Sequence, residues 1–520
     1  MEPFLSANTH SGSGPRRRTI ATGAAWAAPV VMLGAPGVLL AASLPCTVTF
    51  TNTPYSVPQG GTITITGTLS NTAVTTLAVT VPAGWTAGTV TVTGGKFSFT
   101  VTAPANATSA TISVLGGTCA GSVPVTVPVP IGAVWGENLD NTLFRSGGGN
   151  VLYASPVNYV DGTVVPPDGM TISGGYRGAN SYSIINGEVW SHGDGSNATS
   201  PATTAMNAGK FATPAGATFV DVVGFTGGGY ALTSAGEVYS WGFNSGTGSL
   251  GNGTLGPDTD VMKKVTFPAG TVITQISASY TGGIALTSTG EVYAWGINDQ
   301  FDTGTNGPSS TSTAGVSTPK PVLDSSGNPI TGITEVRGRF KGGLALTSSG
   351  QVLSWGVNSG GQLGAGSLTS PTRRGYADYV LTAPGTPLTG VTLLPKFYHE
   401  AYHSGAVVGD QLYTWGYGSY FVHSPTSQAN LAYATPTAYD LAAAGVNGIA
   451  DVSMSYYGIH VLDNSGSVWN WGYGGYGQAG NGTAPTAYIQ TPTQTLTGPG
   501  TPLVASGLGN NSHGGIIAYL

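Results

Sequence analysis

Charged residues are scarce in this sequence of 520 residues. Asp, Glu, Lys and Arg make up only 7% of it, where about 25% is usual. The 16 Lys and Arg residues provide no basic patch for a phosphate backbone, so we expect no nucleic-acid partner. Disordered chains combine low hydrophobicity with high net charge, whereas this chain is 40% hydrophobic and has a net charge of -6. The sequence therefore predicts a folded protein.

Enzyme motifs are also scarce. No phosphate-binding Gly loop and no Ser-His-Asp arrangement is evident. The stretch His399-Glu400-Ala401-Tyr402-His403 matches the H-E-x-x-H pattern of zinc proteases, but that chemistry needs a helix and a third ligand. Pro395 and Gly405 bracket the stretch too tightly for a stable helix, and no Glu follows Glu400. We therefore expect no zinc hydrolase, no metal and no cofactor.

A long run of small and apolar residues lies near the N-terminus. Pro15-Arg16-Arg17-Arg18-Thr19-Ile20 is a charged region of the twin-arginine type, and an uncharged, small and apolar run follows it to Leu44. This pattern predicts an export signal peptide over residues 1–43, in contact with the membrane only transiently. An uncleaved membrane anchor is the alternative. We expect a secreted or envelope-associated protein.

Cysteine is limited to Cys46 and Cys119. In an exported chain, two cysteines predict one disulfide. Between them, Thr or Ser alternates with Val, Ile, Leu or Phe, for example in "GTITITGTLS" and "GKFSFTVTAP", and this period of two is typical of half-buried strands. We predict a small β-sandwich over residues 44–128. Its size and pattern resemble the immunoglobulin-like modules of bacterial surface proteins.

Repetition dominates residues 129–520. "GGYALTSAGEVYSWG" (228–242) returns as "GGIALTSTGEVYAWG" (282–296) and "GGLALTSSGQVLSWG" (342–356), with weaker copies elsewhere. Each copy reads as a β-hairpin with a Gly turn. The seven anchoring tryptophans are Trp135, Trp190, Trp241, Trp295, Trp355, Trp415 and Trp471. Their spacing is typical of solenoids and propellers, so we predict seven stacked units.

The two ends of the repeat region complement each other. The first Trp-Gly, at 135–136, lacks a preceding "GG" strand, and the last such strand, at 513–520, lacks a following Trp-Gly. The C-terminal strand is therefore expected to pair with residues 132–136 and to close a ring. The predicted fold is all-β, a seven-bladed β-propeller preceded by the β-sandwich.

The repeat resembles a known family. "ALTSAGEVYSWGFNS" and "LTSSGQVLSWGVNSGGQLGAG" (346–366) are similar to the RCC1 repeat, named for the regulator of chromosome condensation. This resemblance implies a seven-bladed propeller but no single function. The family includes a nuclear exchange factor for a small GTPase, ubiquitin-ligase modules and secreted bacterial propellers that inhibit β-lactamases.

Some positions depart from the family pattern. RCC1 repeats commonly carry a His three residues before the Ala of "AL", where the three clearest copies of this sequence have Gly228, Gly282 and Gly342. These departures and the export signal argue against guanine-nucleotide exchange. Glu188, Glu237 and Glu291 recur at one position of three units, which indicates a solvent-facing strand position, since a catalytic carboxylate pair needs two different environments.

One aromatic residue stands shortly before the "GG" strand in six of the seven units. These candidate binding residues are Tyr176, Phe225, Tyr280, Phe340, Tyr402 and Tyr456. Propeller symmetry would place them around the axis on one face, where aromatics are common interface anchors. Arg337, Arg339 and Lys341 add a positive patch beside Phe340. Packing between blades is the alternative explanation for these rings.

We therefore predict an exported, non-enzymatic binding protein, monomeric, that holds a protein or glycan partner on one propeller face. The alternative is an inhibitor of a secreted enzyme, as the resemblance to the β-lactamase inhibitors implies. The long segments 303–321 and 417–439 are a second candidate surface, because loops of this length are often functional.

Overall fold

The computed structural model describes most of the chain beyond residue 45. The described residues are 46–53, 55–57, 62–104, 110–126, 133–138, 149–156, 169–175, 178–193, 209–280, 282–308, 310, 312–368, 370–397, 401–418, 431–439, 441–455, 458–482, 488–509 and 515–519. Within these ranges, no helix is both long enough and apolar enough to span a bilayer. The chain divides into two compact units, one ending with strand β9 and the other containing every later strand.

The first unit is built from nine strands. These are β1 (Cys46–Phe50), β2 (Tyr55–Ser56), β3 (Thr62–Leu69), β4 (Ala78–Thr80), β5 (Thr86–Ala87), β6 (Thr91–Thr93), β7 (Lys96–Thr102), β8 (Ala110–Gly116) and β9 (Cys119–Thr126). Strand β1 joins the two halves of the sheet, because it pairs antiparallel with β3 and parallel with β9. Cys46 and Cys119 are partners in that parallel register and form the predicted disulfide.

Alternation along the strands builds the core of this unit. On β7, Phe97, Phe99 and Val101 are buried while the residues between them are more exposed. On β8, Ile112 and Val114 are buried in the same way. A strand places successive side chains on opposite faces, so this alternation separates a buried face from a solvent-exposed one. The immunoglobulin-like character of the unit stays a prediction.

The second unit contains seven sheets of four or five strands, the predicted blades, in which neighbouring strands pair antiparallel except that β31 pairs parallel with β35. Blade 1 contains β10 (Ala133–Asn138), β11 (Gly149–Pro156), β41 (Gly507–Leu508) and β42 (Gly515–Tyr519). Blades 2 and 3 contain β12 (Gly169–Gly175), β13 (Gly178–Ile185), β14 (Glu188–Gly193) and β15 (Gly209–Lys210), then β16 (Phe219–Phe225), β17 (Gly228–Thr233), β18 (Val238–Gly242) and β19 (Thr259–Lys264).

The later blades follow the same order. Blade 4 contains β20 (Ile273–Ser279), β21 (Gly282–Thr287), β22 (Val292–Gly296) and β23 (Val316–Pro321), and blade 5 contains β24 (Ile333–Arg339), β25 (Gly342–Thr347), β26 (Val352–Val357) and β27 (Arg373–Tyr379). Blade 6 contains β30 (Val391–Leu393), β32 (His403–Val408), β33 (Gln411–Gly418) and β34 (Leu431–Tyr439). Blade 7 contains β31 (Lys396–Phe397), β35 (Asp451–Met454), β36 (Gly458–Leu462), β37 (Val468–Tyr473) and β38 (Tyr488–Gln494).

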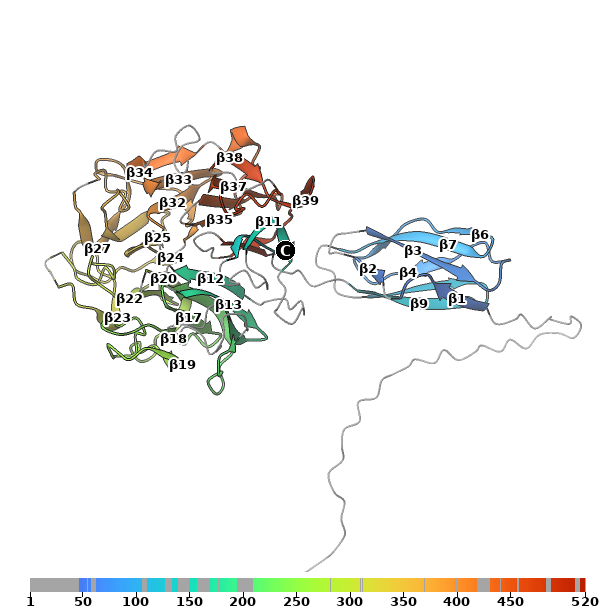
Figure 1. Ribbon diagram of the computed structural model, residues 1–520, viewed down its shortest axis with the longest axis horizontal. Helices are drawn as coiled ribbons and strands as arrows, with labels where there is room; N and C mark the ends of the chain where they lie inside the picture. The colour runs from blue at the N-terminus through green and yellow to red at the C-terminus, as the bar shows by residue number, and fades with distance from the viewer. Residues whose placement is uncertain are drawn as a thin grey trace, which may run out of the picture. The chain divides into compact units, whose positions relative to one another are not determined.

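The blades surround a common centre (Figure 1). The first strand of a blade, such as β20 or β24, lies nearest the centre, and the last, such as β23 or β27, lies at the periphery. Two additional hairpins lie outside the blades, β28 (Leu381–Ala383) with β29 (Thr386–Pro387) and β39 (Leu496–Gly498) with β40 (Thr501–Pro502). The inner strands therefore determine what lines the centre, and the connections that follow them lie on one face.

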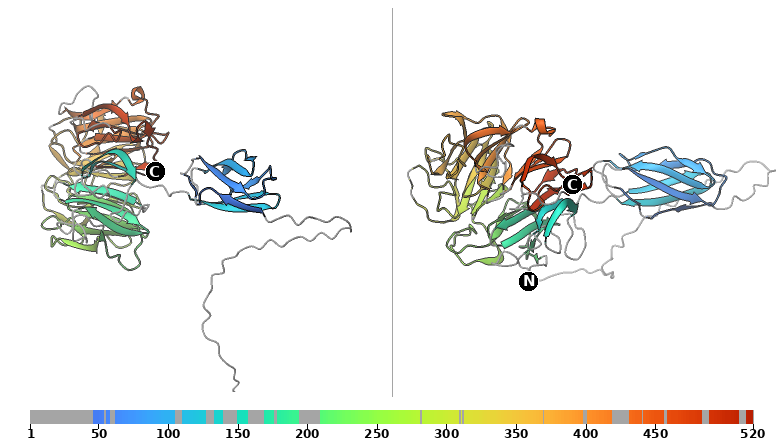
Figure 2. Two further views of the ribbon diagram at one scale, coloured as in Figure 1. Left: turned by 45° about the vertical axis from the view of Figure 1, so that its right-hand side comes forward. Right: turned by 45° about the horizontal axis from the view of Figure 1, so that its top comes forward.

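The predicted closure of the ring is confirmed. Strand β42 pairs antiparallel with β10, with Trp135 opposite Ile516 and Gly136 opposite Gly515. The dark red C-terminal strand accordingly lies beside the teal strands of the same blade (Figure 2). One blade is thus assembled from both ends of the repeat region, and no blade edge is left open at the junction.

Buried tryptophans connect successive blades. Six are at most 1% exposed: Trp135, Trp241, Trp295, Trp355, Trp415 and Trp471. The indole N–H groups of four of them donate to carbonyl oxygens in the preceding blade, Trp295 to Ser249, Trp355 to Asp302 and Trp415 to Gln362 at 3.0 to 3.1 Å, and Trp135 to Gln478 at 3.0 Å. The last bond runs from blade 1 to blade 7 and closes the ring by the same contact.

Trp190 does not belong to this set. Ser191 lies opposite Tyr182, as Ser240 lies opposite Tyr230, so the position equivalent to Trp241 is His192. Trp190 instead occupies the place of Tyr239, at which the side chain is half-buried. The sequence prediction of Trp190 as an anchor is therefore wrong by two residues, although the blade itself is present.

Steric constraints explain why two glycines stand at the "GG" pair. A Cβ at Gly342 would lie 2.3 Å from the Trp355 carbonyl oxygen, and a Cβ at Gly343 would lie 2.3 Å from the Trp355 ring. Only glycine allows such close approach of the backbone. The two glycines therefore make room for the buried tryptophan of their own blade.

Candidate binding site

The predicted aromatic residues fall into different environments. Tyr176 and Tyr456 lie outside the described residues. Phe225, the last residue of β16, is 0% exposed and stacks on Tyr230 with ring centroids 4.9 Å apart. Its ring is part of an apolar cluster that includes Trp295. The structure therefore corrects the assignment of Phe225, because a ring enclosed by the core cannot contact a partner.

The other three predicted rings lie side by side. Tyr280, Phe340 and Tyr402 are half-buried and come from blades 4, 5 and 6. Ring centroids are 5.2 Å apart for Tyr280 and Phe340 and 4.1 Å apart for Phe340 and Tyr402. Tyr417 of β33 extends the row, with its centroid 6.4 Å from that of Tyr402. We call these four residues the aromatic ridge. It spans three adjacent blades.

The backbone explains why these rings meet. Tyr280 and Phe340 directly follow the inner strands β20 and β24, so they occupy equivalent places in adjacent blades. The Phe340 N–H donates to the Ala401 carbonyl oxygen at 3.3 Å, and the Tyr417 N–H donates to the Tyr402 carbonyl oxygen at 3.1 Å. These bonds attach the ridge to rigid elements, and ring pairs at such distances stabilise each other.

Lys341 is inserted beside the ridge. Its ammonium lies 5.9 Å from the Tyr280 ring centroid and 6.0 Å from that of Phe340. The same group forms an ion pair of 2.6 Å with Asp299. The Lys341 backbone is left-handed, with φ 48°, which is uncommon outside glycine and is often found at functional sites. Lys341 thus joins the ridge to the loop of blade 4.

The other two cations of the predicted positive patch are not part of this surface. Arg339 is 0% exposed and donates to the Trp355 carbonyl oxygen at 2.8 Å. Burial, together with the nearby charge of Arg374, lowers the pKa of Arg339 to about 9. Arg337 pairs with Glu335 and donates to the Leu394 carbonyl oxygen, next to blade 6. The predicted patch therefore contributes only Lys341, which lies in the left-handed turn after β24, whereas Arg337 and Arg339 lie within the strand.

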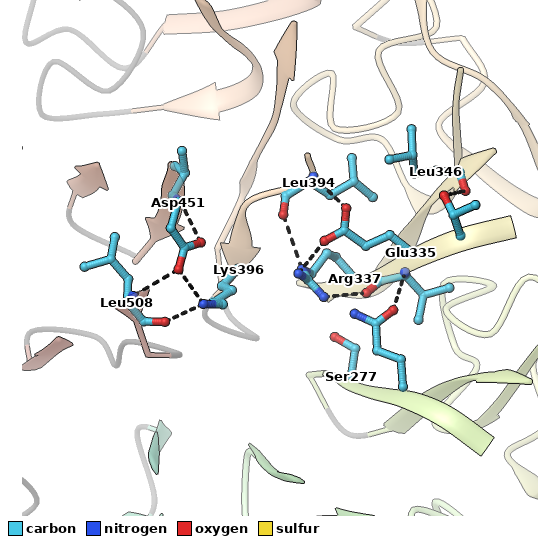
Figure 3. A network of polar contacts seen from close by, with 12 residues as sticks. Ser277, Glu335, Arg337, Leu346, Leu394, Lys396, Asp451 and Leu508 are labelled. Atoms are coloured by element: carbon cyan, nitrogen blue, oxygen red, sulfur yellow. Dashed lines mark hydrogen bonds and ion pairs between the residues drawn. The ribbon is translucent and has the colours of Figure 1, made fainter. Parts of the chain in front are cut away.

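Arg337 belongs to a polar network near the propeller centre (Figure 3). Glu335 accepts from the Leu394 N–H at 2.9 Å, and Arg337 donates to the Leu394 carbonyl oxygen at 3.3 Å. Asp451 accepts from Lys396 at 2.6 Å and from the Leu508 N–H at 3.0 Å. These side chains bond to the backbone of the neighbouring blade, so the network holds inner strands together.

A hollow of about 560 Å³ opens beside this network. Its polar lining includes Thr274, Gln275, Thr334, Glu335 and Thr392. Thr274 and Thr334 stand near the start of β20 and β24, so the hollow lies at the end of the inner strands opposite the aromatic ridge. Gln275 accepts from the Val336 N–H at 2.9 Å. The hollow therefore exposes groups that already bond between blades.

The loop after β22 carries residues that the sequence reasoning missed. Phe301 is left-handed, with φ 63°. Asp302 is 2% exposed, and burial, with a contribution from Asp299, raises its pKa to about 7. Arg373 of β27 lies over the Phe301 ring, 4.7 Å from its centroid. A signal was present in the sequence, because Phe301 and Asp302 stand where blade 5 has Gly361 and Gln362.

The residues of the enzyme-like motifs that the structure describes have structural roles. His399 and Glu400 lie outside the described residues, whereas His403 begins strand β32 and is 2% exposed. Across the described ranges, no three His, Cys, Asp or Glu side chains gather as a metal-binding group. Glu188 pairs with Lys210 at 3.1 Å and Glu237 with Lys264 at 2.6 Å. The repeated Glu position is therefore a cross-strand ion-pair position in these two blades.

The two long segments differ from the expectation of free loops. Residues 316–321 form β23 and residues 431–439 form β34, which are the outer strands of blades 4 and 6. Tyr439 is 3% exposed and packs on Trp471. Residues 419–430 lie outside the described part. Among the described residues of the second segment, Tyr417 joins the ridge.

Known proteins resemble this chain through the propeller. Residues 273–301 match the Regulator of chromosome condensation (RCC1) repeat. The human E3 ubiquitin-protein ligase HERC2 is 29% identical over 279 residues, 53% of this chain and 5% of its own length. The mitochondrial RCC1 domain-containing protein RUG3 of Arabidopsis thaliana is 35% identical over 142 residues, 26% of this chain and 30% of its own. The chain thus spans less than a third of either relative.

Solved structures agree in fold. Prp20p of Saccharomyces cerevisiae, described with its binding to Gsp1p and histones, has a TM-score of 0.57 at 18% identity and covers 75% of this chain and 92% of its own. Human WBSCR16 has a TM-score of 0.58 at 16% identity, covering 75% and 99%. The second unit thus contains a stretch that matches the RCC1 repeat, within a fold similar to that of these propellers.

Proposed function

We propose that this protein is an exported, non-enzymatic binding protein whose aromatic ridge holds a protein partner. The observation that supports this proposal most directly is the row of four half-buried rings on one propeller face. Aromatic side chains supply large contact area at low entropic cost and are enriched at binding hot spots. The related propeller of Prp20p is described by its binding to other proteins, which supports a protein rather than a glycan partner.

The ridge fits binding better than packing alone. A ring needed only between blades would be enclosed, as Phe225 is at 0% exposure, whereas the four ridge rings keep part of their surface in solvent. The Phe340 N–H donates to Ala401 of the next blade and the Tyr417 N–H donates to Tyr402 within blade 6, so these rings are attached to ordered backbone before a partner binds. Such pre-organisation lowers the entropic cost of association.

A pull-down tests the proposal. The full chain is immobilised and exposed to the producing cell's envelope proteins and culture medium, beside a Tyr280→Ala/Phe340→Ala variant that is checked to be folded. We expect a partner that the wild type retains and the ridge variant loses. A Tyr379→Ala/Tyr488→Ala variant is the matched control, because both side chains are 40% exposed on outer strands.

Other outcomes change the proposal. A partner that the ridge variant retains would assign binding to another surface. If the retained partner is a glycan, the proposal of a protein partner is wrong. A retained secreted enzyme that loses activity in a one-to-one complex would establish the inhibitor alternative.

Export has its own test. The Cys46–Cys119 disulfide supports an oxidising compartment, where structural disulfides persist. We propose that the signal over residues 1–43 is removed and that the mature chain is monomeric. Intact-mass measurement of the protein recovered from the medium should show an N-terminus near residue 44, and light scattering should show one chain. A full-length mass in the membrane fraction would contradict cleavage.

A further inference from the structure

A second cation borders the aromatic ridge. Arg373, the first residue of β27, is exposed, and its guanidinium lies 4.7 Å from the Phe301 ring centroid. Its Nη1 donates to the Asp299 carbonyl oxygen at 3.2 Å. The ring and the carbonyl come from blade 4 and the guanidinium from blade 5. Arg373 is therefore held in one orientation without being covered.

Asp299 brings this arginine close to the ridge. Its carboxylate pairs with Lys341 at 2.6 Å, while its carbonyl oxygen accepts from Arg373. The Lys341 side chain is only 17% exposed and lies beside the Tyr280 and Phe340 rings. Lys341 is thus occupied by Asp299, and Arg373 is the cation that remains accessible at this end of the ridge.

The charges at this corner do not balance. Lys341 and Arg373 carry two positive charges, and Asp299 offers one accessible carboxylate. In the described part of the chain, no ion pair joins Arg373 to an acidic side chain. The sequence as a whole carries a net charge of -6. A positive corner on an acidic protein favours an approaching anionic group.

Arginine is suited to this task. Its planar guanidinium binds a carboxylate through two parallel hydrogen bonds, and an arginine already stacked on a ring loses little further entropy on binding. We infer that Arg373 recognises an acidic side chain, Asp or Glu, on the protein partner that the aromatic ridge holds. This inference rests on the proposed function and adds the chemistry of the contact.

A displayed peptide library tests the inference without knowledge of the natural partner. Random peptides on phage are selected on the immobilised full chain, on Arg373→Gln and on Lys263→Gln. Lys263 is the matched control, because it is an exposed cation on the outer strand of blade 3. We expect the wild type and Lys263→Gln to enrich peptides that carry Asp or Glu beside an aromatic residue. Arg373→Gln should bind those peptides at least about tenfold more weakly, as expected for loss of a hot-spot arginine.

Salt dependence gives a second readout. Binding of the selected peptides to the wild type should weaken as ionic strength rises, and binding to Arg373→Gln should respond less, because an exposed charge pair is screened by salt. A merely structural role of Arg373 would leave this dependence unchanged. Equal salt dependence in both proteins would overturn the inference.

The outcomes separate the two proposals. Peptides that lack acidic residues, but are lost on the Tyr280→Ala/Phe340→Ala variant, would keep the ridge as a binding site and overturn the role of Arg373. Acidic peptides that Arg373→Gln retains at full affinity would do the same. If the wild type selects no peptide at all, both the ridge and the Arg373 contact are contradicted.

Discussion

Two loops of the propeller follow the same path with different side chains. Residues 298–304 of blade 4 and 358–364 of blade 5 both accept an indole N–H from the next blade, through the Asp302 and Gln362 carbonyl oxygens. In both, an Asn side chain accepts from the loop, Asn298 from Thr303 and Asn358 from Leu363. The backbone contacts are shared, so they belong to the repeat.

The side chains at two positions distinguish the loops. Blade 5 has Gly361, with φ 86°, where blade 4 has Phe301, with φ 63°. Gln362 is neutral, whereas Asp302 is a buried carboxyl. The blade 4 loop thus contains a strained backbone and a costly buried acid, and it is the loop that contacts Lys341 and Arg373. The comparison shows that the two loops share their backbone hydrogen bonds, whereas their side chains differ and those of blade 4 form part of the candidate site.

Removal of a shared tryptophan should have the largest effect. Trp355→Ala or Trp415→Ala should each lower the free energy of unfolding by about 3 to 5 kcal/mol, since both rings are fully buried, as for other buried aromatics. Denaturant unfolding of the two variants measures it. Trp190→Ala, at a half-buried position, is the control and should lose less. A clear difference between Trp355→Ala and Trp415→Ala would contradict the equivalence of the two loops.

Asp302→Gln, which installs the blade 5 residue, should change the pH dependence of stability. The pKa of Asp302 is raised from 3.8 to about 7 in the folded state, so the folded state binds more protons between these values. Stability contributed by Asp302 is full below pH 4 and is lost as pH rises to 7, with a slope of at most about 1.4 kcal/mol per pH unit. The variant should therefore be more stable than the wild type at pH 8.

The measurement is the unfolding free energy of both proteins at pH 5 and pH 8. Comparison at each pH cancels other titrating groups, among them His460, whose pKa burial lowers to about 3. Parallel pH profiles for the two proteins would show that the Asp302 carboxyl does not titrate in this range.

Gly361→Ala should cost less than the tryptophan variants. A Cβ at this left-handed residue would lie 2.6 Å from the Tyr433 carbonyl oxygen, so strain and contact together should lower stability by about 1 to 3 kcal/mol. Thermal unfolding measures the loss. Gly366→Ala is the control, because its φ is 82° but its Cβ would meet nothing within 4 Å. Equal losses would show that backbone strain alone decides the cost.

Phe301→Gly should have the smallest effect on stability. Glycine relieves the left-handed strain while the half-buried ring is lost, so the net change should be under about 1 kcal/mol. Arg373, however, loses its stacking partner, and affinity for acidic peptides should fall. Calorimetric unfolding and peptide titration measure the two quantities. Unchanged peptide affinity would show that the ring does not orient Arg373.

The sequence by itself determined the propeller architecture, because the repeat specifies it. A recurring "GG" strand and Trp-Gly specify one blade each, and the unmatched halves at 135–136 and 513–520 specify the closing pair. Closure follows from the pattern since a blade with a missing strand leaves unpaired backbone groups, and only the other end can supply them. The disulfide followed in the same way from two cysteines in a chain that is predicted to be exported.

The site was decided by tertiary structure. Phe225 and Tyr280 both precede a "GG" strand, but Phe225 pairs with Gly228 as Ser279 pairs with Gly282, so Phe225 is enclosed and Tyr280, one position later, is half-buried. Arg339 and Lys341 are two residues apart, yet only Lys341 reaches the ridge. Arg373 meets Phe301 across two blades. Sequence periodicity reports which residues recur, whereas exposure and proximity depend on the side-chain direction and on neighbouring blades that the ring brings together.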